Sequence, residues 1–94
     1  MSATAPEDRN ADAARATAAV AEWLRVAAGL APDAPVSVGE EPHCPDASCA
    51  LRRTVLEWSD PADGGTRRAE IIKPVVYVRR ADVERAARVA RAGG

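Results

Sequence analysis

The stretch Leu51-Arg-Arg-Thr-Val-Leu-Glu-Trp-Ser59 precedes Asp60-Pro-Ala-Asp-Gly-Gly65, and together they predict the first strand and the turn of a β-hairpin. β-Branched and aromatic residues in the first segment favour extended structure. Glycines at the end of the second segment can adopt the positive φ angles that tight turns need. We expect the returning strand to run from Thr66 to Val78. Pro74 cannot donate to a strand ladder, so it marks an edge, a bulge or a bend in that strand.

Two helices and a further strand are expected around this hairpin. A helix from Asp12 to Ala28 has one apolar stripe, and Gly29 ends it. Val36–Gly39 is a short strand, and a second helix from Asp82 to Ala92 has a small apolar stripe. The stripes consist of Val20, Trp23, Leu24 and Ala27 in the first helix, and Val83, Ala86, Ala87 and Ala90 in the second. The order predicts an α+β domain, α-β-β-β-α, with a three-stranded antiparallel sheet and helices mostly on one face.

The length of 94 residues predicts one small domain. We expect residues 1–10 to form a disordered tail and residues 11–94 to form the domain. The apolar fraction is 47%, but half of these residues are alanines, so the core is thin. A second copy, a protein partner, a metal or a crosslink would help to stabilise such a core. We therefore expect a protein partner or a homodimer.

Charge and hydropathy exclude several classes of partner. The formal net charge of −1 and the scarcity of aromatic residues predict no nucleic-acid binding. No apolar run approaches the roughly 20 residues that span a bilayer, so we expect no membrane insertion. The first ten residues do not have the pattern of a secretory signal, and a cytoplasmic location is the expectation. The arginine-rich, lysine-poor composition is typical of a bacterial protein from a GC-rich genome.

The strongest chemical feature is the loop between the first two expected strands. It contains the only histidine, His43, and the only two cysteines, Cys44 and Cys49. Thiolates and imidazole are preferred ligands of zinc, and a short C-x₄-C spacing resembles one half of a structural zinc site. Since no second cysteine pair exists, a complete site would need His43 with a carboxylate, or a second subunit. Zinc is the cofactor that this hypothesis implies.

Two other interpretations of the cysteine loop stay open. Cys44 and Cys49 could act as a redox or regulatory pair, for which nearby cations would lower the thiol pKa. In the simplest hairpin register, Lys73 lies opposite Arg53, and Arg79 and Arg80 follow closely. This group could stabilise a thiolate or hold an anion. Alternatively, the cysteines close a disulfide that staples the loop, and their role is purely structural.

The segment from Glu41 to Val83 resembles a group of short, uncharacterised bacterial proteins. The resemblance rests on five features: an acidic residue, a Cys-Pro with a second cysteine, a Thr-Val strand, an Ile-x-Lys-Pro segment and an Asp-Val pair. Here they are Glu41, Cys44-Pro45 with Cys49, Thr54-Val55, Ile71-Ile72-Lys73-Pro74 and Asp82-Val83. The resemblance implies no activity, but it groups Cys44, Cys49, Lys73 and Pro74.

The patterns typical of catalytic sites are missing from the sequence. We therefore expect a small non-enzymatic accessory domain that binds a soft divalent metal through Cys44, Cys49 and His43 and docks a partner protein. The alternatives are a thiol redox or regulatory module, and a structural protein-interaction domain with a stapled loop.

Overall fold

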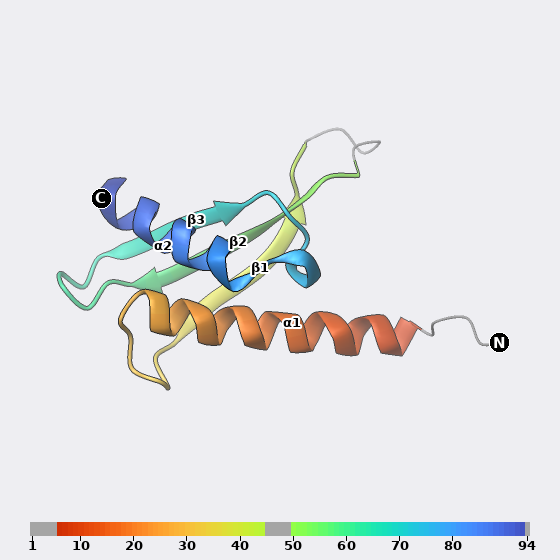
Figure 1. The fold of residues 1–94 in the computed structure, drawn as a ribbon, viewed down its shortest axis with the longest axis horizontal. Coiled ribbons are helices and arrows are strands. Elements are labelled where there is room, and N and C mark those ends of the chain that lie inside the picture. The colour runs from red at the N-terminus through yellow and green to blue at the C-terminus, as the bar shows by residue number, and fades with distance from the viewer. Residues whose placement is uncertain (1–5, 45–49, 94) are drawn as a thin grey trace.

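A computed structural model describes residues 6–44 and 50–93 of the chain. The described elements follow the order α-β-β-β-α, with a single turn of 3-10 helix before the last helix (Figure 1). Their bounds are α1 Pro6–Ala27, β1 Val36–Pro42, β2 Arg52–Ser59, β3 Thr66–Ile71, η1 Val75–Tyr77 and α2 Arg80–Gly93. The predicted α+β class and element order are confirmed.

The three strands form an antiparallel sheet in the order β1-β2-β3. Val36 faces Trp58 across β1 and β2, and Thr54 faces Ile71 across β2 and β3. The central strand β2 has the β-branched and aromatic residues that favour extended structure. Because β2 lies between the other two strands, β1 and β3 are the two edges of the sheet.

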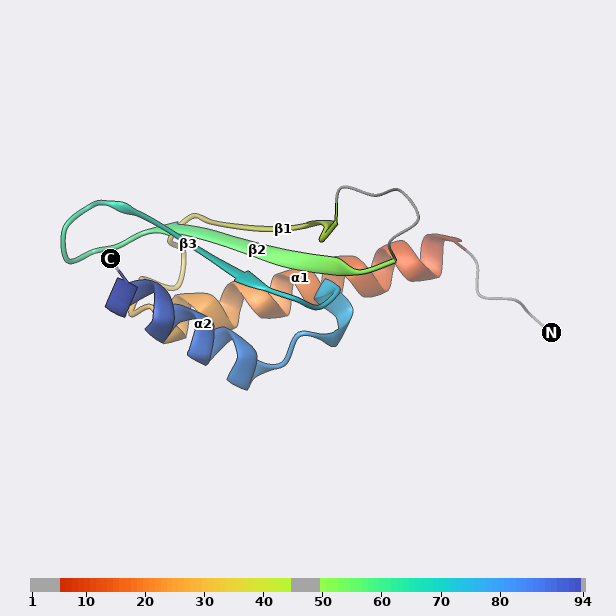
Figure 2. The same ribbon diagram turned by 90° about the horizontal axis from the view of Figure 1, so that it is seen from above.

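Both helices lie on the same face of the sheet, as the view from above shows (Figure 2). Alternate residues of a strand point to opposite faces, so only one set of β2 side chains meets the helices. Leu56 and Trp58 belong to this set, and both are buried. They pack with Val20 and Leu24 of α1 and Val83 of α2 in one core cluster. Both predicted helix stripes thus face the core.

The other face of the sheet has no helix on it within the described residues (Figure 2). It has a network of four charged side chains, in which Arg53 and Arg68 each lie within ion-pair distance of Glu41 and Glu70. The Arg53 hydrogen bond holds the pKa of Glu41 below its ordinary value. Val55 on this face is only 8% exposed. The sheet therefore has one apolar face and one charged face.

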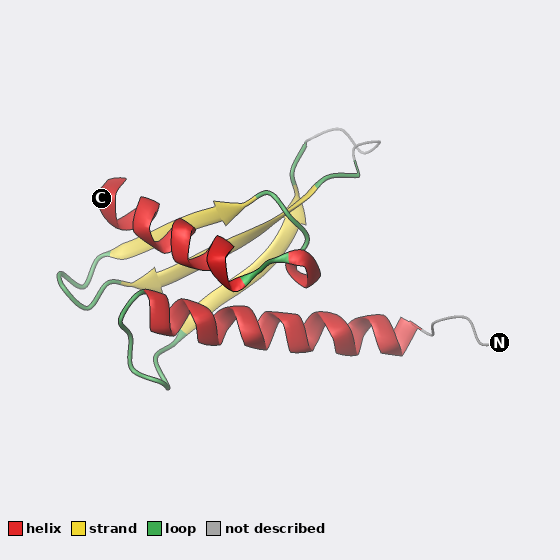
Figure 3. Cartoon of the chain, in the orientation of Figure 1, coloured by secondary structure: helices red, strands yellow, loops and turns green. Residues whose placement is uncertain are grey.

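Three predicted boundaries are wrong by three or more residues, and the others differ by two residues or fewer. The third strand ends at Ile71 instead of Val78, and the chain then turns into η1 (Figure 3). A continuing ladder would need the N–H of Lys73, which instead donates to the carbonyl oxygen of Ile71 at 2.8 Å, so the chain turns away from the sheet at this point. The first helix begins at Pro6, a position where proline is favoured because its missing donor would have no helical partner. The first strand extends to Pro42. Residues 1–5 of the predicted tail lie outside the described residues.

None of the helices in the described ranges combines the length and hydropathy that crossing a bilayer requires.

Candidate functional site

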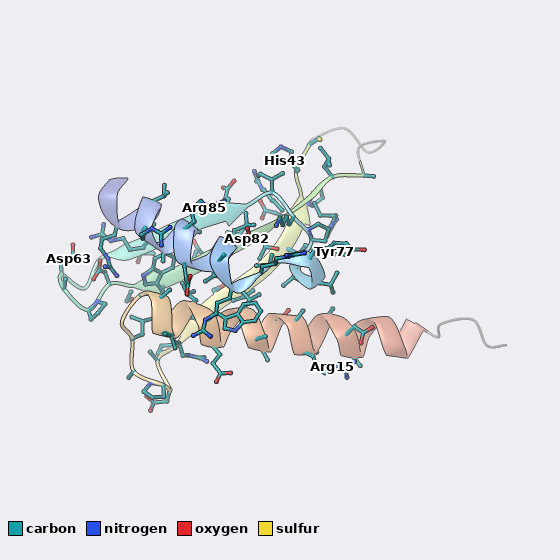
Figure 4. The ribbon with its side chains drawn as sticks, in the orientation of Figure 1. Arg15, His43, Asp63, Tyr77, Asp82 and Arg85 are labelled. Carbon is teal, nitrogen blue, oxygen red and sulfur yellow. The ribbon has the colours of Figure 1, made fainter. Side chains whose placement is uncertain are left out.

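The cysteine loop begins where β1 ends, at the end of the sheet where His43 lies (Figure 4). The backbone N–H of His43 donates to the carbonyl oxygen of Leu51 at 2.9 Å, which continues the β1–β2 ladder. Its side-chain Nδ1 is buried and has no hydrogen-bond partner among the described residues. Cys44 is partly buried and is not a free thiol. Cys49 lies outside the described residues.

The described residues provide little support for the zinc hypothesis. Residues 6–44 and 50–93 bring together no group of three or more histidine, cysteine, aspartate or glutamate side chains that could hold a metal ion. The neighbours His43 and Cys44 are the two expected ligands within these ranges. A complete ligand set, like the redox pair and the stapled loop, depends on Cys49. All three interpretations stay predictions.

The hairpin register contradicts the expected pairing of Lys73 with Arg53. Thr54 faces Ile71, so Arg53 is in register with position 72, and Lys73 lies beyond the end of β3. A register shift of one residue moves a side chain to the opposite face of a sheet. The expectation is therefore wrong because the turn fixes a register one residue different from the simplest one.

Three of the four cations expected to stabilise a thiolate or anion pair with carboxylates, and the fourth, Arg79, contacts one through its backbone. Arg53 pairs with Glu41 and Glu70, and Arg80 lies 3.6 Å from Glu84. The backbone N–H of Arg79 donates to the carboxylate of Asp82 at 2.9 Å. Lys73 Nζ donates to that same carboxylate at 2.8 Å. The Lys73 and Arg79 donors lower the pKa of Asp82. Within the described residues, Arg53, Lys73 and Arg80 are thus matched by carboxylates.

The Ile-x-Lys-Pro segment is held in place by side chains from β1 and β2. The hydroxyl of Thr54, which is fully buried, donates to the carbonyl oxygen of Lys73 at 2.8 Å. A carboxylate oxygen of Glu40 accepts from the N–H of Val75 at 2.7 Å. These bonds satisfy backbone groups that come after Ile71 and therefore have no partner in the β2–β3 ladder. The structure gives Lys73 and Pro74 a role in the turn from β3 to α2.

The free edge of β3 has backbone groups that point away from the sheet. Asp60 N–H donates to the carbonyl oxygen of Gly65 at 2.8 Å, so this pair is hydrogen-bonded. Bonded and non-bonded pairs alternate along an antiparallel ladder, so Arg67, Ala69 and Ile71 bond to β2. The His43–Leu51 bond fixes which residues of β2 bond to β1. The residues of β2 that remain are the same ones that the β2–β3 ladder uses, so the two ladders agree. The outward-pointing residues of β3 are Thr66, Arg68 and Glu70.

A groove runs between this free edge and α2. Its volume is about 610 Å³, and its walls are residues 68–73 together with one side of α2. Asp82 and Arg85 lie along that side of the helix (Figure 4). Ala69, Ile71, Ala86 and Ala90 give the groove an apolar lining. Ile72 and Val89 also line it and are 50% and 66% exposed. Apolar side chains and backbone groups that no described residue pairs with therefore lie side by side.

The edge of β1 differs from the edge of β3. By the same alternation, the outward-pointing residues of β1 include Glu40 and Pro42. Proline has no N–H to offer to an added strand, and such residues are typical of protected edges. β3 has no proline between Thr66 and Ile71. The two edges are thus unequal, and β3 is the one able to accept a strand.

A second hollow, of about 550 Å³, lies between α1 and η1. Asp12, Ala16, Val76 and Tyr77 line it. It does not adjoin a strand edge, so it offers less for recognition than the groove beside β3.

The sequence interpretation did not identify the β3–α2 groove as a site. Val89 is an exposed apolar residue on a polar face of α2, and this exception in the helix pattern was the feature that could have indicated the groove. Comparison of the chain with models of known families, with curated proteins and with solved structures found no match.

Proposed function

We propose that this domain is a protein-docking module that binds an extended polypeptide segment along β3. The observation that carries the proposal is the juxtaposition of an open strand edge and an apolar groove. An added strand pairs with the outward backbone groups of Thr66, Arg68 and Glu70. Its alternate side chains enter the groove between β3 and α2. Backbone pairing supplies affinity in this mode of binding, and the groove supplies selectivity.

The charges on the edge restrict which segment binds. Arg68 and Glu70 point to the uncovered face, so a bound strand has side chains beside them on that face. Opposite charges directly across a strand pair are favourable and like charges are unfavourable. The preferred segment therefore has an acidic residue opposite Arg68 and a basic residue opposite Glu70. Its other face is apolar, to match Ile71 and Val89.

A pair of variants at one position tests strand addition. Arg68→Pro removes the outward N–H without removing a bond to β2, while Arg68→Ala removes the same side chain and keeps the N–H. The probe is a short synthetic peptide in which valine alternates with glutamate and arginine. We expect this peptide to shift the amide NMR signals of Arg68, Glu70 and Val89 in the unmodified chain. Arg68→Ala should weaken binding, and Arg68→Pro should abolish it.

The control is the same peptide with its pairing amides methylated, which should leave the β3 signals unchanged. Far-UV circular dichroism establishes that each variant is folded. At concentrations where the chain is monomeric, the proposal fails if the peptide leaves β3 unchanged, or if Arg68→Pro binds it as tightly as Arg68→Ala does.

A second candidate function, metal or thiol chemistry at the cysteine loop, rests on His43. Its buried Nδ1 atom has no hydrogen-bond partner in the described residues, and a buried polar atom without a partner costs about 1–3 kcal/mol. A ligand at this end of the sheet would remove that cost. The chemistry proposed there is binding of zinc by the imidazole and the thiolate of the adjacent Cys44, and it requires that the sulfur of Cys44, which is not a free thiol in the structure, first be released by reduction.

Metal analysis and thiol titration of the protein, purified without a histidine tag, separate the three interpretations. Near-stoichiometric zinc, together with thiols that become reactive after chelation, supports the metal site. Reversible loss of two reactive thiols under mild oxidant supports the redox module. Thiols that appear only after reduction, without metal, support the stapled loop and exclude the other two.

A further inference from the structure

The sequence of β3 is complementary to itself. Arg68 and Glu70 are the two charged residues whose backbone groups point outward from the free edge, and Ala69 lies between them. We propose that the segment docked on β3 is the β3 strand of a second copy of this chain, paired antiparallel about a two-fold axis at Ala69. This inference rests on the docking function proposed above and names its partner.

The register follows from geometry and charge. In a two-fold pair of antiparallel strands, facing residues must point to the same face of the joined sheet, so the axis passes through a residue position. An axis at Arg68 sets two arginines opposite each other, and an axis at Glu70 sets two glutamates opposite each other. An axis at Ala69 sets Arg68 opposite Glu70 of the second copy, twice. Of these three registers, only the last avoids like charges, and it also sets two pairs of opposite charges across the interface.

The backbone supports the same register. Arg68 and Glu70 both point their N–H and C=O groups outward, so each facing pair exchanges both hydrogen bonds across the interface. The small Ala69 side chains meet at the axis, where they do not obstruct close approach. The result is a continuous six-stranded sheet in which β1 forms both outer edges.

The exposed apolar residues are also accounted for. An axis perpendicular to the sheet keeps the helices of both copies on one face. The groove beside β3 then adjoins the groove of the second copy. Ile72 and Val89, both at least half exposed in the single chain, lie along this groove. Association therefore covers apolar surface as well as joining the strands.

Charge exchange provides a specific test. Arg68→Glu sets glutamate opposite Glu70 of the second copy, and Glu70→Arg sets arginine opposite Arg68. We expect each variant alone to raise the dimer dissociation constant at least about tenfold, because two attractive pairs become repulsive. A mixture of the two variants restores opposite charges at both positions. We therefore expect heterodimers in the mixture at concentrations where each variant alone is monomeric.

Sedimentation equilibrium measures the dissociation constants, and native mass spectrometry identifies the heterodimer by its mass. All samples contain a reductant so that no disulfide links two chains. Arg88→Glu is the matched control, because Arg88 is exposed on α2 and does not line the groove. This control should associate as the unmodified chain does. Circular dichroism shows whether each variant is folded.

The outcomes separate this inference from the docking function. If the unmodified chain is monomeric at all concentrations but the peptide still shifts β3, self-association is overturned and docking of another segment stands. If the peptide also fails to bind, both proposals are overturned. The Ala69 register is overturned if neither charge exchange changes the dimer dissociation constant, or if the mixture contains no heterodimers.

Discussion

The Nζ atom of Lys73 lies 2.8 Å from the Oδ2 atom of Asp82, and this ion pair joins the turn after β3 to the first turn of α2. The same carboxylate oxygen accepts the backbone N–H of Arg79, the residue before the helix. A carboxylate at the third helical position that reaches back to this N–H caps the helix and complements its dipole. Lys73, expected from the sequence to face Arg53, therefore helps to anchor α2.

Asp82→Asn should lower stability in a pH-dependent way. Lys73 and the Arg79 N–H hold the pKa of Asp82 below its ordinary value of 3.8. A lowered pKa in the folded state means that the ionised carboxylate stabilises the fold. This stabilisation is complete well above pH 3.8 and is lost as the pH falls through the folded-state pKa. We expect a loss of about 1–3 kcal/mol at neutral pH.

Urea unfolding of both proteins, at neutral pH and at a pH below the folded-state pKa, measures this difference. The stabilities of the variant and the unmodified chain should converge in acid. Glu84→Gln is the control, because its pair with Arg80 is exposed and such pairs contribute little. A difference for Asp82→Asn that is constant across this pH range contradicts the prediction.

Thr54→Val should destabilise the domain although it conserves the shape of the side chain. The Thr54 hydroxyl is buried and donates to the carbonyl oxygen of Lys73. Its removal leaves that carbonyl oxygen without this partner, at a cost of about 1–3 kcal/mol. Thermal or urea unfolding measures the loss, and Thr66→Val, at an exposed position, is the control. Equal stability of the two variants would show that the buried bond contributes nothing.

Leu56→Ala should be among the most damaging substitutions in the core. Leu56 is 0% exposed and lies at the centre of the sheet, between β1 and β3. Removing a buried leucine side chain costs about 2–5 kcal/mol, which is a large share of the stability of a small domain. Val26→Ala removes apolar atoms from a position that is 64% exposed and should change little. Unfolding free energies compare the two, and similar losses would contradict the assigned core.

Gly64→Ala should destabilise the β2–β3 hairpin through the backbone alone. Gly64 has a φ of +73°, and its N–H donates to the carbonyl oxygen of Asp60 in the turn. An added Cβ would meet no atom within 4 Å, so the cost is conformational, at about 1–2 kcal/mol. Gly39→Ala is the matched control, because Gly39 has ordinary strand geometry and equally open surroundings. Circular dichroism during urea unfolding measures both, and a neutral Gly64→Ala would contradict the assigned turn.

Local sequence patterns predicted the elements well where one periodicity dominated. The stripes with Val20 and Leu24 in α1 and Val83 in α2 do face the core. The Asp60–Gly65 segment does form the turn between β2 and β3. The ends of elements were harder to predict, because they depend on distant partners. The end of β3, for example, is held by Thr54 and Glu40 of the other two strands.

The sequence by itself determined the α+β class, the element order and the apolar face of each element, because these follow from spacing along the chain and from turn chemistry. Only the tertiary structure decided the hairpin register, the carboxylate partner of Lys73 and the open edge beside α2. Each of these depends on how residues far apart in the sequence meet. A one-residue difference in register is nearly invisible to local propensity, yet it reverses the face on which every side chain of the strand lies.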